Sequence, residues 1–442
     1  MDRLALEESE SRFAAFVERL NEVIGHRDRT GPFRDYCTGL LAGSERKSVE
    51  PLAAITAPQR VSAQHQSLLH FVGKACWSDA AVLGKVRELT LPVLEKRGPV
   101  EAWIIDDTGY PKKGKHSVGV ARQYCGQLGK QDNCQIAVSL SVANRHASLP
   151  IAYRLYLPKD WADDEDRRRR AGVPEDVTFA TKPEIALEQI AQALKDGVPQ
   201  GVVLMDAGYG VNTALREGLT ALGLSYVAGI LPQTDLALSL PPTAFETIVW
   251  REGACEALSS RFARLRVCPA HRDYNLTAPR PEEWLLIEWP EGEAEPTKYW
   301  LSTLPKDIAF ESLVDLTKLR WRIERDYLDL KQEIGIGHYE GRGWRGFHHH
   351  ATLCIAAYAF LILEREMIPP SRPYSAGQRQ KAHIPEGYKP RGHAAQAGEA
   401  HPKLDCDAQT QDRRRLGQKP AEMSLLRRDE TNSGLSVTLV TQ

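Results

Sequence analysis

The sequence predicts a mixed α/β fold in which a helical N-terminal region precedes a sheet that a β-rich segment interrupts. Residues 1–95 carry apolar residues at spacings of three and four, which is typical of amphipathic helices. From about residue 100, short β-rich runs and helical patterns follow one another in the order β-β-β-α-β-α-β. Between 231 and 310 the composition shifts to Pro, Trp, Thr and Glu, with further strand-like runs.

The order of these patterns predicts the domain organisation. Residues 1–95 form a helical N-terminal domain, in which Pro51 and Pro58 separate the helices. Residues 96–230 and 311–368 form the α/β domain, with flanking helices on its sheet, because helical periodicity resumes at about 311. Residues 231–310 are then a β-rich insertion within that domain. Residues 369–442 lose all periodicity and become rich in Pro, Gly, Gln and Arg, which predicts a disordered tail.

Composition and charge limit the class of protein. The 442 residues are 42% hydrophobic, which is ample for a buried core, and the formal net charge is −1. That net charge alone argues weakly against a nucleic-acid partner. Whether the chain binds nucleic acid therefore depends on how the charges are distributed along it. The eight cysteines are scattered without a C-x-x-C pair, which argues against a zinc site. The N-terminus MDRLALEESESRF is acidic and polar, unlike a secretory signal, and we expect a cytoplasmic protein.

Acidic residues end two strands that read as buried. Asp106 and Asp107 end the run AWIIDD, and Asp206 ends the run GVVLMD. Each is followed by a turn that contains glycine, and ligands of such sheets bind beyond the carboxyl ends of the strands. Either acid alone is explained as well by the capping of a turn. Two such positions together favour a site.

A third carboxylate lies in the run KLRWRIERDYLDLKQEIG, which has helical periodicity. Arg320, Glu324 and Lys331 are four and seven residues apart, so they share a helix face that differs from the apolar face. A salt-bridged surface helix explains this pattern equally well in isolation. The flanking Trp321 and Ile323 favour a position of Glu324 near the core.

Two strand-end aspartates and one helical glutamate would form a site of oxygen ligands only. Mg²⁺ and Mn²⁺ prefer such ligands, and the cations would offset the repulsion between clustered carboxylates. Two ions ~3.5–4 Å apart are suited to in-line attack on a phosphodiester.

Together these residues resemble the DDE transposases of bacterial insertion sequences, in the group that carries a β-rich insertion before its catalytic glutamate. The group's signature is Tyr, two residues, Arg, three residues, Glu, six residues, Lys, and Arg320, Glu324 and Lys331 keep this spacing. Thr317 occupies the tyrosine position, so one signature residue is missing. In this family the aspartate that precedes Thr is the usual ligand, which favours Asp107 over Asp106.

The resemblance implies an RNase H-like catalytic domain with Asp107, Asp206 and Glu324 as catalytic metal ligands. Mg²⁺, for which Mn²⁺ substitutes, would bind as two ions per site. The implied reaction is cleavage at the ends of the insertion sequence followed by transfer of the 3′-hydroxyl into target DNA. The partners would be double-stranded DNA, in terminal repeats and target, and a second copy of the chain in a synaptic complex. The location would be the bacterial nucleoid, with the N-terminal helices binding DNA.

The local charge agrees with a DNA partner. Residues 109–131 contain five Lys or Arg and no acid, and residues 318–345 contain seven basic residues against five acids. These groups would hold the phosphate backbone. The predicted DNA-binding residues are Arg320, Lys331, Lys112 and Lys113.

Two other functions stay open at this point. One is a catalytically inactive or repurposed transposase that only binds DNA, which the unusual tail suggests. The other is a resolvase or RNase H-type hydrolase, which would cut DNA or hybrids without strand transfer.

Overall fold

The computed structural model describes residues 3–231, 244–251, 257–270, 280–367 and 436–439. They all belong to one compact unit. The predicted tail lies outside the described residues except for a short strand at 436–439, and the predicted domain boundaries stay predictions.

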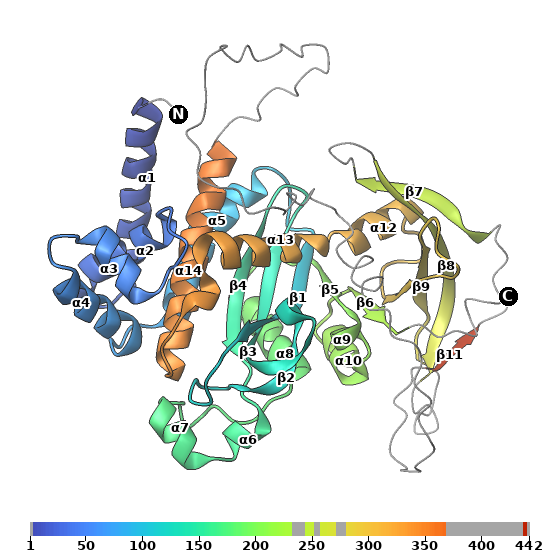
Figure 1. The fold of residues 1–442 in the computed structure, drawn as a ribbon. Helices are drawn as coiled ribbons and strands as arrows, with labels where there is room; N and C mark the ends of the chain where they lie inside the picture. The colour runs from blue at the N-terminus through green and yellow to red at the C-terminus, as the bar shows by residue number, and fades with distance from the viewer. Residues whose placement is uncertain (1–2, 232–243, 252–256, 271–279, 368–435, 440–442) are drawn as a thin grey trace, which may run out of the picture. The chain divides into compact units, whose positions relative to one another are not determined.

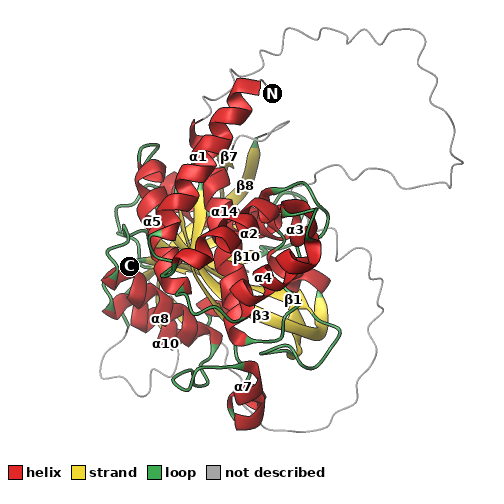
Figure 2. Cartoon of the chain, turned by 90° about the vertical axis from the view of Figure 1, so that its left-hand side faces the viewer, coloured by secondary structure: helices red, strands yellow, loops and turns green. Residues whose placement is uncertain are grey.

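The N-terminal part of the described chain is helical, as the apolar spacing predicts (Figures 1 and 2). Phe16, Val17 and Leu20 are buried on one face of the first helix. The hydroxyl of Ser78 caps the last of these helices by accepting a hydrogen bond from the backbone N–H of Ala81. The helices are α1 (Arg3–Asn21), η1 (Arg27–Arg29), α2 (Thr30–Leu41), α3 (Val49–Thr56), α4 (Val61–Gly73) and α5 (Asp79–Glu95).

The sheet is mixed, and its first strand is central. β1 pairs antiparallel with β3 on one side and parallel with β5 on the other. β3 also pairs antiparallel with β2 and β4, and β5 pairs parallel with β6. The strands are β1 (Ala102–Pro111), β2 (Ala121–Cys125), β3 (Lys130–Ala143), β4 (Ser148–Leu155), β5 (Val202–Met205) and β6 (Tyr226–Ile230).

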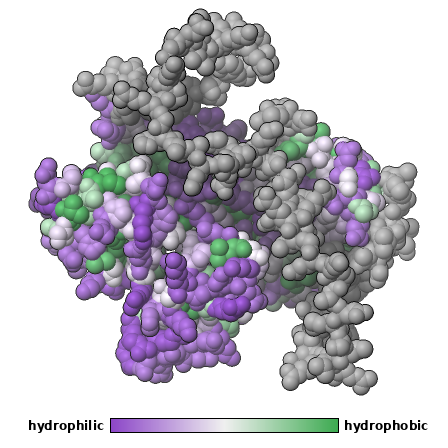
Figure 3. Space-filling model, in the orientation of Figure 1, coloured by the Kyte–Doolittle hydropathy of each residue, from purple (hydrophilic) through white to green (hydrophobic). Residues whose placement is uncertain are grey.

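Helices and short turns connect these strands. The longest of the connecting helices, α8, starts at a capping box in which Thr181 and Glu184 bind each other's backbone N–H groups. Figure 3 shows hydrophilic residues gathered over α6 and α7, in the lower part of the view. The elements are η2 (Gly126–Leu128), α6 (Lys159–Ala162), α7 (Glu165–Ala171), α8 (Lys182–Lys195), α9 (Ala207–Gly210) and α10 (Thr213–Ala221).

The β-rich segment continues the same sheet rather than forming a separate one. β10 pairs antiparallel with β6, and β9, β8 and β7 follow outward, so that the described residues form one 11-stranded sheet. At its outer side the short strand at 436–439 pairs antiparallel with β8. The strands are β7 (Glu246–Arg251), β8 (Leu258–Ala270), β9 (Glu283–Trp289), β10 (Lys298–Ser302) and β11 (Ser436–Leu439).

Helices after residue 309 return to the central strands. Lys318, the last residue of α12, ion-pairs with Glu288 of β9 at 2.5 Å, and its amine lies 4.9 Å from the ring centre of Trp250. This contact ties the β-rich segment to the helix that leads into the candidate site. The elements are α12 (Phe310–Lys318), α13 (Trp321–Asp329), the π-helical turn η5 (Leu330–Ile334), η6 (Ile336–His338) and α14 (Trp344–Met367).

Helix α14 is long and apolar enough to cross a membrane by length and composition alone, and among the described residues it is the one such helix. In the structure 89% of the most apolar 18-residue stretch of this helix is buried. It packs against α2, α4, α5 and β4. This packing accounts for its composition as that of a core helix.

The central strand β1 separates two hydrophobic cores. Ile105 belongs to the core that includes residues of α8 and α14, whereas Ile104 belongs to the core that includes Ile323 of α13. Successive side chains of a strand point to opposite faces of the sheet. Asp106 therefore follows Ile104 on the α13 side, and Asp107 follows Ile105 on the α8 side.

Candidate active site

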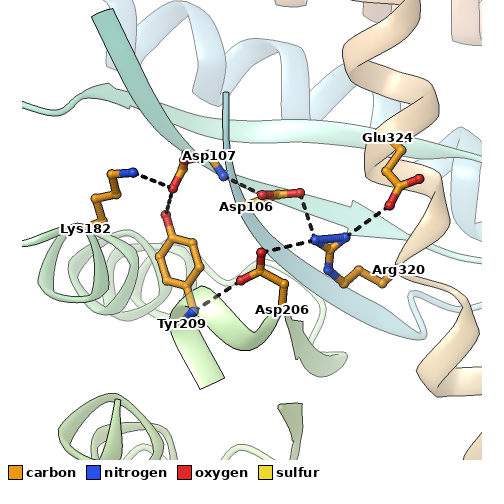
Figure 4. Close-up of polar contacts among 7 residues, drawn as sticks. All are labelled: Asp106, Asp107, Lys182, Asp206, Tyr209, Arg320 and Glu324. Carbon is orange, nitrogen blue, oxygen red and sulfur yellow. Dashed lines mark hydrogen bonds and ion pairs between the residues drawn. The ribbon is translucent and has the colours of Figure 1, made fainter. Parts of the chain in front are cut away.

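Three carboxylates that are distant in sequence converge on one guanidinium group (Figure 4). The Nη2 atom of Arg320 lies 3.3 Å from Oδ2 of Asp106 and 3.6 Å from Oδ2 of Asp206. Its Nη1 atom lies 3.5 Å from Oε1 of Glu324. The structure thus brings Asp206 and Glu324 together, as predicted, and it adds Asp106 to them.

Each acid is placed by a different element. Asp106 lies within β1, opposite Ser139 of β3, and the prediction that this strand ends at the acids is wrong, because β1 stays paired with β3 as far as Pro111. Asp206 follows β5 and caps α9, because its Oδ1 atom accepts a hydrogen bond of 3.2 Å from the backbone N–H of Tyr209. Glu324 lies in the first turn of α13, four residues after Arg320, so the two side chains meet on one helix face.

A glycine allows α9 to lie against the sheet. A Cβ atom at Gly210 would overlap the carbonyl oxygen of Gly229 in β6. The helix that Asp206 caps can therefore approach β6 only because residue 210 has no side chain. The GYG sequence after Asp206 serves this close packing.

Burial and neighbouring negative charges raise the pKa of Asp106. The side chain of Asp106 is 15% exposed, whereas those of Asp206 and Glu324 are 41% and 59% exposed. Burial raises the pKa of Asp106 to about 7, and the negative charges of Asp206 and Asp107 add to the rise while Arg320 opposes it. The site therefore has an excess of negative charge that one guanidinium does not offset.

Asp107 lies beside this group but faces the other way. Its Oδ2 atom accepts hydrogen bonds from the amine of Lys182 at 3.0 Å and from the hydroxyl of Tyr209 at 3.1 Å. Asp107 has no ion pair with Arg320 among the contacts of the described residues. The assignment of Asp107 as a metal ligand stays a prediction, and the geometry favours Asp106 as the partner of Asp206 and Glu324.

Sequence reasoning missed Lys182 and Tyr209 as residues of this site. Lys182 begins a helix whose capping box was visible as TKPE, and Tyr209 follows an aspartate at a strand end. Those signals locate both residues near element boundaries. They do not indicate that both side chains meet at Asp107.

The other predicted DNA-binding residues differ in burial and in the groups that they contact. The amine of Lys331 lies 5.6 Å and 5.9 Å from the ring centres of Tyr110 and Tyr327, and burial lowers its pKa. The amine of Lys112 donates a 2.7 Å hydrogen bond to the carbonyl oxygen of Tyr339, and burial lowers its pKa too. Lys113 is exposed.

Thr317, which occupies the position of the signature tyrosine, forms a hydrogen bond within its own helix. Thr317 is buried, and its hydroxyl donates a 2.7 Å hydrogen bond to the carbonyl oxygen of Leu313 one turn earlier in α12. Its side chain is thereby satisfied within its own helix.

Divalent cations fit the donor chemistry of this site. In the part of the chain that the structure describes, no three His, Cys, Asp or Glu side chains are close enough to hold one ion. At the candidate site, the guanidinium of Arg320 lies between the carboxylates. Asp106, Asp206 and Glu324 nevertheless offer only carboxylate oxygens, with three negative charges against one positive charge, which suits Mg²⁺ or Mn²⁺.

Comparison with known proteins identifies the family of this chain. A family model described as DDE superfamily endonuclease matches residues 19–244, more than half of the chain, and a model described as transposase DDE domain matches residues 171–360. The chain therefore belongs to the DDE superfamily.

A curated relative makes the class more specific. The chain is 28% identical over 309 residues to the probable transposase for insertion sequence element IS701 from Microchaete diplosiphon, with 69% of this chain and 74% of that protein covered. This protein is thus similar to an IS701-type insertion-sequence transposase. A solved structure, the NurA nuclease from Sulfolobus solfataricus, matches with a TM-score of 0.29 and 8% identity over 52% of this chain and 78% of that chain.

Proposed function

We propose that this protein cleaves DNA at the ends of an insertion sequence and joins the freed 3′-hydroxyl to target DNA. The convergence of Asp106, Asp206 and Glu324 on Arg320 carries this proposal. The cluster lies where β5 ends beside the middle of β1. Carboxylates gathered in this way are placed for chemistry rather than for stability, since their like charges repel. Membership of the DDE superfamily and the similarity to a probable transposase support the reaction class.

The catalytic domain would have an RNase H-like fold. The strand order β4-β3-β1-β5-β6 supports this assignment, with β3 antiparallel to β1 and with β5 and β6 parallel to it. In this order the first strand is central and carries one acid, and the neighbouring parallel strand ends at the second. The β-rich segment 231–310 would be the insertion before the glutamate.

Asp106, Asp206 and Glu324 would hold Mg²⁺ or Mn²⁺, two ions per site, with Asp106 in place of Asp107. When bound, the ions supply charge for the scissile phosphate and activate the attacking oxygen. Arg320 lies among the acids and would bind phosphate oxygens there, together with Lys331.

The other two predicted DNA-binding residues, Lys112 and Lys113, directly follow β1 in the sequence. The exposed Lys113 is available to the phosphate backbone, whereas the amine of Lys112 already binds a backbone carbonyl oxygen. We infer that the N-terminal helices bind the terminal repeats. Two copies of the chain would act on paired DNA ends in the bacterial cytoplasm, at the nucleoid.

The test uses the full chain with Mg²⁺ and a linear DNA that carries the repeats flanking its coding sequence. We expect nicking at the repeat ends and a product joined to target DNA, both lost in Asp206→Asn. Asp329→Asn is the matched control, because Asp329 is an acid of α13 that pairs with Arg325 at 3.0 Å. Equal cleavage by Asp206→Asn and the wild type contradicts the proposal.

Two other outcomes identify the alternative functions. DNA binding in a shift assay without any metal-dependent nicking indicates a repurposed DNA-binding protein. Nicking without joined product indicates a hydrolase.

A further inference from the structure

Asp107 takes part in a cluster of its own next to the three acids (Figure 4). Both of its described donors, the Lys182 amine at 3.0 Å and the Tyr209 hydroxyl at 3.1 Å, bind the same carboxylate oxygen, Oδ2. Hydrogen bonds to an ionised group are stronger than those between neutral groups. The Asp107 carboxylate is therefore held toward α8 and α9.

Tyr209 links this cluster to a proposed metal ligand. Its backbone N–H donates to Oδ1 of Asp206 at 3.2 Å, while its hydroxyl donates to Oδ2 of Asp107. The ring between these two contacts is buried, with 3% of the residue exposed. Tyr209 thus contacts Asp206 through its backbone and Asp107 through its side chain, and burial restricts the movement of its ring.

Lys182 anchors the cluster to a well-defined helix start. The hydroxyl and backbone N–H of Thr181 both donate to Oε2 of Glu184, at 2.8 Å and 2.7 Å. This capping box fixes the first turn of α8, where Lys182 lies. The Lys182 amine thus contacts Asp107 from a helix turn whose backbone is fixed by these hydrogen bonds.

We propose that Asp107, Lys182 and Tyr209 form a positioning cluster that orients the Asp206 carboxylate relative to β1, and that Asp107 itself binds no metal ion. This proposal rests on the proposed function of the same site. Ligation by Asp107 through Oδ2 would require the loss of two hydrogen bonds that hold it away from Arg320. Residues that orient metal ligands through hydrogen bonds tune the affinity of the site without touching the metal.

The first experiment measures Mn²⁺ binding to the full chain without DNA by calorimetry. We expect Asp107→Ala and Tyr209→Phe each to raise the Mn²⁺ dissociation constant about 10-fold, which is typical of outer residues of a metal site. Asp107→Asn keeps an acceptor for Tyr209 and should retain more affinity than Asp107→Ala. Asp106→Asn should remove binding.

The matched control is Asp196→Asn. Asp196 pairs with Arg87 and follows the other end of α8, 14 residues and about 20 Å from Lys182. This change removes a carboxylate from an ion pair on the same helix, and it should leave the Mn²⁺ affinity unchanged.

The second experiment measures the cleavage rate of end DNA against Mg²⁺ concentration. The positioning role predicts that Tyr209→Phe raises the half-saturating Mg²⁺ concentration about 10-fold and recovers most of the wild-type rate at saturation. The double variant Asp107→Ala/Tyr209→Phe should raise the half-saturating Mg²⁺ concentration no further than the more severe single variant does. The reason is that both residues act on Asp206 through the same hydrogen bond.

Three results overturn the proposal: loss of Mn²⁺ binding in Asp107→Asn while Asp106→Asn still binds, an unchanged Mn²⁺ affinity in Tyr209→Phe, or fully additive effects in the double variant. Failure of the proposed function is distinguishable from these results. A wild-type chain that binds Mn²⁺ but does not cleave end DNA overturns the proposed reaction, and its Mn²⁺ affinities still decide the role of Asp107.

Discussion

Replacement of Asp106 by Asn should stabilise the protein at high pH, although it removes a proposed catalytic group. Burial, with help from Asp206 and Asp107, raises the pKa of Asp106 to about 7 in the folded protein. In the unfolded chain the pKa returns to about 3.9. The folded state therefore holds the proton more tightly, and the resulting stability is complete below pH ~3.9 and is lost as the pH rises through about 7.

The size of this effect follows from the two pKa values. Ionisation of Asp106 disfavours the folded state by about 1.5 kcal/mol at pH 5 and about 4 kcal/mol at pH 8. Asparagine does not ionise and escapes this cost. The free energy of unfolding of Asp106→Asn, relative to wild type, should therefore increase by about 2–3 kcal/mol between pH 5 and pH 8.

Urea unfolding at the two pH values, with a chelator present, measures this change. Since each comparison is made at one pH, the titration of groups that do not interact with Asp106 cancels. Asp329→Asn is the control, because it removes one acid from an ion pair at the helix surface and should change the stability by about 0.5 kcal/mol or less at both pH values. A stability difference for Asp106→Asn that is equal at both pH values, or smaller at pH 8, refutes the reasoning.

Two further changes test how the site is held in place. Lys318→Met leaves the 5% exposed carboxylate of Glu288 without its cation and should lower the free energy of unfolding in urea by about 3–5 kcal/mol, part of which the added change Glu288→Gln should restore. Gly210→Ala forces α9 away from β6 and should abolish end cleavage and Mn²⁺ binding, because Asp206 caps that helix. Gly114→Ala, at which a Cβ meets nothing within 4 Å, should retain both, and equal activities of the two variants would contradict this prediction.

Local sequence signals were sufficient where an element begins and ends through its own residues. Helix α8 ends at Lys195, and Gly197 follows at a φ of 69°, a conformation that favours glycine, so a glycine in the sequence accounts for this helix end. The predicted order after residue 100 is observed only in part. Four strands, β1 to β4, rather than three precede the first helix, and the short helices α6, α7 and α9 add to the predicted ones.

Long-range pairing was beyond the sequence signals. Nothing in the run around Lys298–Ser302 indicates that β10 pairs with β6, so the β-rich segment reads as a separate unit although it extends the central sheet. Pairing partners of this kind depend on side-chain packing between segments far apart in sequence, which periodicity does not describe.

The two adjacent aspartates illustrate this limit most clearly. Strand geometry alone establishes that Asp106 and Asp107 face opposite sides of the sheet. It does not establish which side α13 covers, because both sides of β1 are apolar: Ile104 and Ile105 are each buried. The side is decided by Ile323, which packs in the core that contains Ile104 and so brings Glu324 and Arg320 to the face of Asp106. A contact more than 200 residues away in sequence thus determines which of two neighbouring carboxylates joins the acid cluster.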